Sequence, residues 1–85
     1  MKITFKIEGT KANIDNFNEN LDWRWLWEMA KGVLTQWRED DETLYVSVSS
    51  KIPDYLKELR GDELAEFENA LSRGCKKFNV TYTKI

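Results

Sequence analysis

The sequence predicts one α+β domain that spans residues 1–85 and contains four strands and two main helices. Segments in which apolar and polar residues alternate, as in half-buried strands, occur near both ends and in a central pair. Two further segments place apolar residues three or four positions apart, which is typical of amphipathic helices. The chain has 85 residues, 41% hydrophobic and 33% charged, a size and balance that suit a single folded domain.

The first strand is predicted at residues 3–7, where apolar and polar side chains alternate, and Gly9 with Thr10 ends it. A helical pattern follows from about Ile14 and ends at Gly32. Its apolar stripe contains Ile14, Phe17, Leu21 and Trp25, spaced by three, four and four residues. We therefore expect one continuous helix whose stripe packs on the sheet.

A β-hairpin is predicted where residues 33–38 and 43–49 flank the acidic stretch EDDE, with the turn at Asp40 and Asp41. In that register Trp37 opposes Leu44, Thr35 opposes Val46 and Val33 opposes Val48. The apolar members would face the core: Val33, Trp37, Leu44, Val46 and Val48. The outer face would then carry Gln36, Arg38, Tyr45 and Ser47.

The C-terminal third predicts a short helix, a long helix and a last strand. Pro53 can open the short helix, which Gly61 ends, and Asp62 suits the N-cap of the second main helix. Leu64, Phe67 and Leu71 form the stripe of this second main helix, and Gly74 is its expected end. The last strand is expected where Phe78, Val80 and Tyr82 alternate with polar residues.

The resulting order is β-α-β-β-α-β, with a short extra helix before the second main helix. This order predicts a ferredoxin-like, or split β-α-β, fold with a four-stranded antiparallel sheet and two helices on one face. A meander of the same elements in another strand order is the alternative. The topology is shared by many unrelated proteins and carries no function by itself.

The residue types argue against catalysis. The chain has no histidine, which removes the commonest general base and zinc ligand, and only one cysteine, Cys75. The acidic stretch at residues 39–42 lacks the ligand spacing of a calcium loop. We expect no catalytic residue, metal, cofactor or small-molecule substrate, and we expect Cys75 to be a small buried residue.

Composition also bears on location and partners. Charged residues interrupt every apolar run, and the N-terminus lacks the apolar block of a signal peptide, so no membrane segment is expected. A single cysteine cannot form an internal disulfide, which favours the cytoplasm. The formal net charge of −2 argues against nucleic acid as the partner. A rival hypothesis remains open, in which Tyr45, Lys6 and Arg38 on the open sheet face bind single-stranded nucleic acid.

The stretch LDWRWLWEMAKG holds three of the four tryptophans. On a continuous helix Trp25 joins the core stripe, while Trp23, Leu26 and Trp27 form a patch on the opposite side. Three alternatives stay open. The helix breaks near residues 18–20 and Asp22 caps a new segment that turns Trp23 and Trp27 inward; residues 52–59 cover the patch; or the stems of Arg24 and Lys31 cover it.

These observations predict a small cytoplasmic, non-enzymatic protein-binding module. It would act as an inhibitor or adaptor, for instance one encoded by a virus or mobile element, that occludes a partner protein. The expected contact residues are the anchors Trp23, Leu26 and Trp27 and the acidic tip of Glu39, Asp40, Asp41 and Glu42, which would steer the partner or mimic phosphate. A structural homodimer is the third hypothesis.

Overall fold

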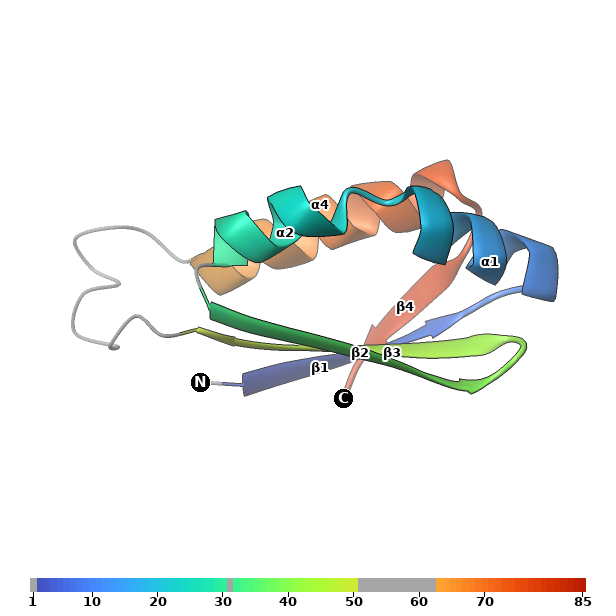
Figure 1. The fold of residues 1–85 in the computed structure, drawn as a ribbon, viewed down its shortest axis with the longest axis horizontal. Coiled ribbons are helices and arrows are strands. Elements are labelled where there is room, and N and C mark those ends of the chain that lie inside the picture. The colour runs from blue at the N-terminus through green and yellow to red at the C-terminus, as the bar shows by residue number, and fades with distance from the viewer. Residues whose placement is uncertain (1, 31, 51–62) are drawn as a thin grey trace.

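The computed structural model describes residues 2–30, 32–50 and 63–85, which form an antiparallel sheet with three helices on one of its faces (Figure 1). The elements are β1 (Lys2–Glu8), α1 (Lys11–Asn20), α2 (Trp23–Ala30), β2 (Gly32–Asp40), β3 (Thr43–Ser50), α4 (Glu63–Lys77) and β4 (Thr81–Lys84). The predicted α+β class and antiparallel four-stranded sheet are confirmed. The short helix expected after Pro53, and the Asp62 cap, lie outside the described residues.

The sheet has the strand order β2-β3-β1-β4, and every neighbouring pair is antiparallel. The core lies between the sheet and the helices. Its largest fully buried side chains come from every layer: Phe5, Ile7, Leu44, Val46 and Val48 from the sheet, and Ile14, Phe17, Leu26, Phe67 and Leu71 from the helices. Phe5 sits at the centre, with its ring 6.1 Å from Phe67 and 5.8 Å from Tyr82.

The first predicted helix is two helices. α1 begins at the N-cap Thr10, whose side chain accepts a hydrogen bond from the Asn13 amide, and ends at Leu21, which has an extended backbone. Asp22 then caps α2, because its carboxylate accepts a 3.0 Å hydrogen bond from the Trp25 amide. The expectation of a continuous helix is therefore wrong. Of the alternative with a break, the Asp22 cap and the inward turn of Trp23 are confirmed, but the break lies at residues 21–22 instead of 18–20, and the Trp27 side chain lies outside what the structure describes.

The break rotates the tryptophans relative to the core. Trp23 turns inward, where it packs edge-on against Phe17 at 5.6 Å and donates its indole N–H to the Asn18 carbonyl at 2.8 Å. Leu26 is only 1% exposed, whereas Trp25 is 46% exposed. The predicted core role of Trp25 and the predicted surface position of Leu26 are both wrong, because the interruption shifts the helical phase after Leu21.

The hairpin forms, but its register differs from the prediction by one residue. Trp37 opposes Tyr45 instead of Leu44, and the pairing shifts between Arg38 and Asp40, so Glu39 is an extra residue in β2. The two turn residues are Asp41 and Glu42. A one-residue slip moves every side chain of a strand to the other face, so the prediction that Trp37 and Val33 face the core is wrong.

The second main helix, α4, passes through Gly74 and ends at Lys77, so the predicted stop at Gly74 is wrong. The chain leaves the helical path two residues after Lys77, at Asn79, whose φ of 58° is left-handed. The Val80 amide bonds the Cys75 carbonyl and the Asn79 amide bonds the Lys76 carbonyl, which is the Schellman pattern. Gly74 instead allows close packing, since a Cβ there would lie 2.5 Å from the Leu21 side chain.

Candidate contact surface

The sheet face that points away from the helices is open among the described residues (Figure 1). The register sets its side chains in rows across the strands. One row runs Trp37, Tyr45, Lys6 and Thr83, and the next runs Thr35, Ser47 and Thr4. A third row joins Val33, Ser49 and Lys2. Hydroxyl side chains therefore dominate the middle of this face, which we call the open face.

Large apolar side chains gather on the open face. The structure describes four large hydrophobic residues that are exposed, and three of them belong here: Trp37 at 45%, Val33 at 50% and Ile85 at 66%. Ile85 continues the alternation from Thr83, and its amide bonds the Thr4 carbonyl at 2.9 Å. The fourth is Trp25 on α2. Most of the large apolar side chains that the structure describes as exposed thus lie on the open face, at its two edges and not in one patch.

Trp37 and Tyr45 stack across the two strands, with ring centroids 5.3 Å apart and an interplanar angle of 10°. Such a pair holds both rings in one orientation and gives a rigid aromatic ridge. The Tyr45 hydroxyl donates to the Glu39 carboxylate at 3.3 Å, which places an acidic group beside the ridge. The bulge at Glu39 thus places the carboxylate where it meets the tyrosine.

Charges on the open face are separated along the strands. Lys2 begins β1 and lies in the row of Val33, while Glu8 ends β1 and pairs with Thr43 and Thr81. Glu39 lies toward the same end as Glu8, because both neighbour the hairpin turn. Lys6 lies between them in the row of Trp37 and Tyr45, so the hairpin end of the face is acidic, while the two lysines lie at the far end and near the middle.

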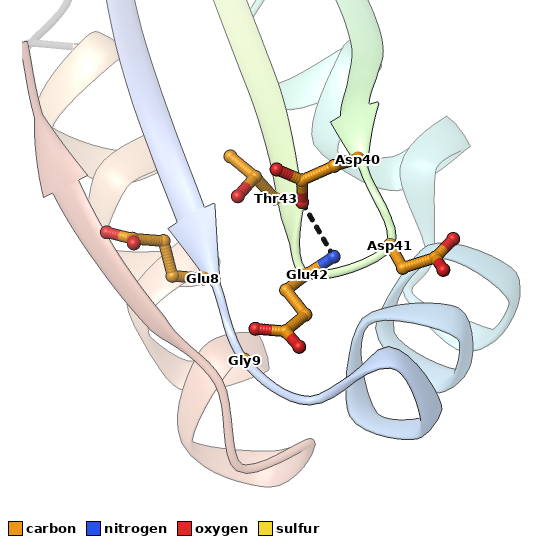
Figure 2. A pocket seen from close by; sticks show the side chains of 6 residues that line it. All are labelled: Glu8, Gly9, Asp40, Asp41, Glu42 and Thr43. Carbon is orange, nitrogen blue, oxygen red and sulfur yellow. Dashed lines mark hydrogen bonds between the residues drawn. The ribbon is translucent and has the colours of Figure 1, made fainter.

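The predicted acidic tip lies at that acidic end and borders a shallow hollow of about 380 Å³ (Figure 2). The hollow is lined by Glu8, Gly9, Asp40, Asp41, Glu42 and Thr43. The Asp40 carboxylate accepts a 2.8 Å hydrogen bond from the Glu42 amide and so closes the turn. Figure 2 shows the carboxylates of Glu8, Asp41 and Glu42 pointing in different directions, so they do not converge on one ligand position.

Arg38 holds the tip against α1. Its guanidinium donates to the Asp15 carboxylate at 2.6 Å and to the carbonyls of Asp40 and Asp41 at 3.0 and 2.7 Å. Hydrogen bonds from Lys11 and then Arg38 hold the pKa of Asp15 below its ordinary value. Arg38 therefore lies on the helix side of the sheet, and its predicted place on the outer face with Tyr45 is wrong.

The predicted helix patch does not form one surface. Leu26 is buried and Trp23 is packed against the core, so neither presents its side chain to a partner in the way that the sequence predicted. Of Trp27 only its place in α2 is described. Figure 1 shows α2 toward the end of the sheet opposite the hairpin turn, so the structure does not bring the helix patch and the acidic tip together.

Other chemistry in the described residues is sparse. Cys75 is a free thiol, 2% exposed, and burial raises its pKa to about 12, so it is protonated and unreactive near neutral pH. Within residues 2–30, 32–50 and 63–85, no three His, Cys, Asp or Glu side chains are grouped so that they would hold a metal ion. No helix in the described part of the chain has the length and apolar character needed to cross a membrane.

No known protein family matches this chain, and no curated protein sequence matches it significantly.

Sequence reasoning missed Trp37, Val33 and Ile85 as surface residues. The signal that would have found the first two is the pair Trp37 and Tyr45, because aromatic residues favour direct cross-strand pairing. Matching these two residues moves the register by one and places Leu34 on the core side, where it packs against the buried cluster.

Proposed function

We propose that this chain is a non-enzymatic protein-binding module and that its open face makes the contact. The observation that carries the proposal is the stacked Trp37–Tyr45 pair, which lies on the sheet face that no described helix covers and in which Trp37 is half exposed. Aromatic residues on rigid elements are the usual anchors of protein interfaces, because they bury a large area and lose little conformational entropy. The open face replaces the helix patch of Trp23, Leu26 and Trp27 as the proposed anchor.

The acidic tip supports a steering role in the same proposal. Glu39, Asp40, Asp41 and Glu42 are exposed and lie at one end of the open face. A localised negative potential of this kind speeds the approach of a basic partner and fixes its orientation. An inhibitor or adaptor in the cytoplasm that occludes a partner's surface is the role that this combination of a rigid ridge and a charged end supports best.

The fold assignment within this proposal is ferredoxin-like. The strand order β2-β3-β1-β4 supports it, because β1 lies between β3 and β4 and the helices that join the strands cover one face. An open sheet face is a general feature of such an arrangement of two layers. That feature makes the aromatic ridge accessible to a partner.

Single-stranded nucleic acid is the second candidate partner, and one observation favours it. Trp37, Tyr45 and Lys6 occupy a single row across the sheet, where a base would stack on a ring beside a cation. Three observations weigh against it. The Glu39 carboxylate accepts a hydrogen bond from Tyr45, which puts a negative charge in that row. The sequence predicted that Arg38 would bind the nucleic acid, but Arg38 forms an ion pair with Asp15. The chain's net charge of −2 also offers little electrostatic attraction to a phosphate backbone.

Capture from the native cell tests the proposal. Tagged wild type, Trp37→Gln and Trp25→Gln are crosslinked, purified with and without nuclease, and compared by mass spectrometry. Trp25→Gln is the matched control, because Trp25 is 46% exposed and Trp37 is 45% exposed. Trp37 lies on the open face, whereas Trp25 lies on α2. We expect nuclease-resistant partners that Trp37→Gln loses and Trp25→Gln keeps. If only Trp25→Gln loses the captured partners, the contact surface is on α2 and the proposal for the open face is wrong.

Titration with oligonucleotides separates the two partner classes. We expect no change in tryptophan fluorescence when single-stranded DNA or RNA is added at physiological salt, because Lys2 and Lys6 are the cations that the described strands contribute to the open face and they lie four residues apart. If the chain binds an oligonucleotide with submicromolar affinity and Tyr45→Ala abolishes that binding, the partner is nucleic acid and not protein.

A further inference from the structure

We propose that strand β2 pairs antiparallel with β2 of a second copy of this chain, so that the two four-stranded sheets join edge to edge. The two-fold axis would stand perpendicular to the sheet and pass between the two copies of Thr35. The inference goes beyond the proposed function, because it uses an edge of the sheet and leaves the open face uncovered. It follows from the difference between the two sheet edges, the directions of the backbone groups in β2, and the sequence of β2.

The two edges of the sheet are protected to different degrees. β4 is four residues long, and its Lys84 forms an ion pair with Glu68 at 3.0 Å. Short edge strands that carry lysine resist pairing with another chain. β2 is nine residues long, and its stretch 33–37 contains no charged residue, proline or glycine. Every side chain of this stretch is exposed except Leu34, which is partly buried. Of the two edges described, β2 is therefore the one that can accept a further strand.

The backbone of β2 offers hydrogen-bonding groups along its free edge. The Gly9 amide donates to the Glu42 carbonyl at 3.2 Å, which continues the ladder between β1 and β3. Because peptide groups alternate in direction along each strand, this bond fixes the directions in β2 as well. The odd-numbered residues of the stretch 33–37 bond to β3, and Leu34 and Gln36 direct their amides and carbonyls outward. Among the described residues, no hydrogen bond uses these outward groups.

The sequence of β2 is complementary to itself. Val33 and Trp37 lie symmetrically about Thr35, two residues away on each side. In antiparallel pairing about Thr35, the outward groups of Leu34 meet those of Gln36 in the second copy. The same register sets Val33 directly opposite Trp37 of the second copy, and aromatic and β-branched residues stabilise each other in such pairs. One register therefore satisfies the backbone groups and covers both exposed apolar side chains of β2.

The charged groups fit this arrangement. Because the axis is perpendicular to the sheet, both copies keep their helices on one side and their open faces on the other. Lys6 lies on β1, which β3 separates from the contact, so the second copy does not cover it. The acidic tips, residues 39–42, lie at opposite ends of the joined strands, because antiparallel pairing directs the two ends of β2 apart. Parallel pairing would place the tips side by side, where like charges repel.

The length of the contact sets its strength. Pairing from Gly32 to Arg38 runs for about 24 Å and forms about eight backbone hydrogen bonds. Contact along one edge buries less than the roughly 800 Å² per partner of a stable interface, so the backbone bonds supply most of the affinity. We therefore expect a weak dimer with a dissociation constant between about 10 μM and about 1 mM. Because the contact is two-fold, assembly stops at two chains.

The first test compares two substitutions of one residue by sedimentation equilibrium. Gln36→Pro removes an outward amide and keeps the bonds to β3, which the neighbouring residues make. Gln36→Thr is the matched control, because it changes the exposed side chain and keeps the amide. We expect wild type and Gln36→Thr to pass from the mass of one chain to the mass of two. Gln36→Pro should raise the dissociation constant about tenfold or more, with circular dichroism confirming that it is folded. A single-chain mass for wild type at about 1 mM, or equal dimers from both variants, overturns the inference.

The second test needs no variant. The Ile85 amide bonds the Thr4 carbonyl at 2.9 Å, so by the same alternation Tyr82 and Lys84 direct their amides away from β1. Hydrogen exchange of wild type, followed by NMR at about 20 μM and about 1 mM, compares the amides of the two edges. We expect exchange at Leu34 and Gln36 to slow about threefold or more at the higher concentration, and exchange on β4 to stay unchanged. Equal slowing at both edges, or slowing at neither, contradicts pairing through β2.

Discussion

The two faces of the sheet use the same strands for different purposes. On the covered face Phe5, Val46 and Val48 are completely buried against the helices. On the open face the neighbouring residues of the same strands are Thr4, Lys6 and Ser47, interrupted by a stacked aromatic pair. The covered face is explained by folding, because burial of apolar area stabilises the core. The open face holds exposed apolar side chains that folding does not bury, and the proposed protein contact would use them.

The covered face should be the more sensitive of the two. Phe5→Ala should lower the free energy of unfolding by about 3–5 kcal/mol, because it leaves a cavity between Phe67 and Tyr82. Thr83→Ala, on the open face of β4, should cost about 1 kcal/mol or less. Urea denaturation of both variants measures the difference. Equal losses would mean that the open face is also part of the folding core.

The same contrast holds within α2. Leu26→Ala should lower the free energy of unfolding by about 2–5 kcal/mol, and Trp25→Ala by less than about 1 kcal/mol, because only Leu26 is buried. This order is opposite to the one that a continuous helix predicts. Thermal or urea unfolding of the two variants checks it, and a larger loss for Trp25→Ala would mean that α1 and α2 are one helix in solution.

Removal of the aromatic ridge should cost less stability than removal of a core side chain. Trp37→Thr replaces an indole that is 45% exposed with a residue that favours strands, and it removes the stacking on Tyr45, worth about 0.5–1.5 kcal/mol beyond the area that the pair buries. The sequence-based register predicts a loss of about 3–5 kcal/mol for truncation of a buried Trp37. Denaturation midpoints with unchanged slopes distinguish these values. A large loss would place the indole in the core.

The smallest effect concerns the ion pairs of Asp15. Its pKa is lowered in the folded protein by Lys11 and Arg38, so its contribution to stability is present above its ordinary value near pH 4 and is lost as the pH falls through the lower folded pKa. Asp15→Asn should therefore lower the thermal midpoint slightly near neutrality, and the difference from wild type should disappear as the pH falls below about 4. Thermal midpoints between about pH 2 and 7 measure this. An unchanged acid profile would show that the pairs do not persist in solution.

Local patterns were enough to predict most elements. Alternation located β1 and the hairpin strands, and three–four spacing located the helices, because each pattern reports one side of an element that must be buried. The fold class followed from their order. The predicted lone buried cysteine also agrees with the structure, where Cys75 lies inside α4 against the core.

Which side of each element faces the core was harder to predict than the presence of the element. The interval from Leu21 to Trp25 fits a continuous helix, and only the capping ability of Asp22 marks the break. In the hairpin, the extra residue at Glu39 changes the register without any change in composition. The first error exchanged the positions predicted for Trp23 and Trp25, and the second placed the exposed Trp37 in the core. The candidate site was therefore misplaced although its elements were largely located.

The strand order also has a consequence for the time course of folding. β1 lies between β3 and β4, so one edge of the first strand pairs with residues 43–49 and the other with residues 81–84. During synthesis the second edge of β1 has no partner until the last strand has left the ribosome. Contacts that join distant parts of a chain form slowly, since a long loop must close first. A nascent chain stalled before Thr81 should expose the Tyr82 site on Phe5, and chaperones that bind extended apolar segments would find β1 there.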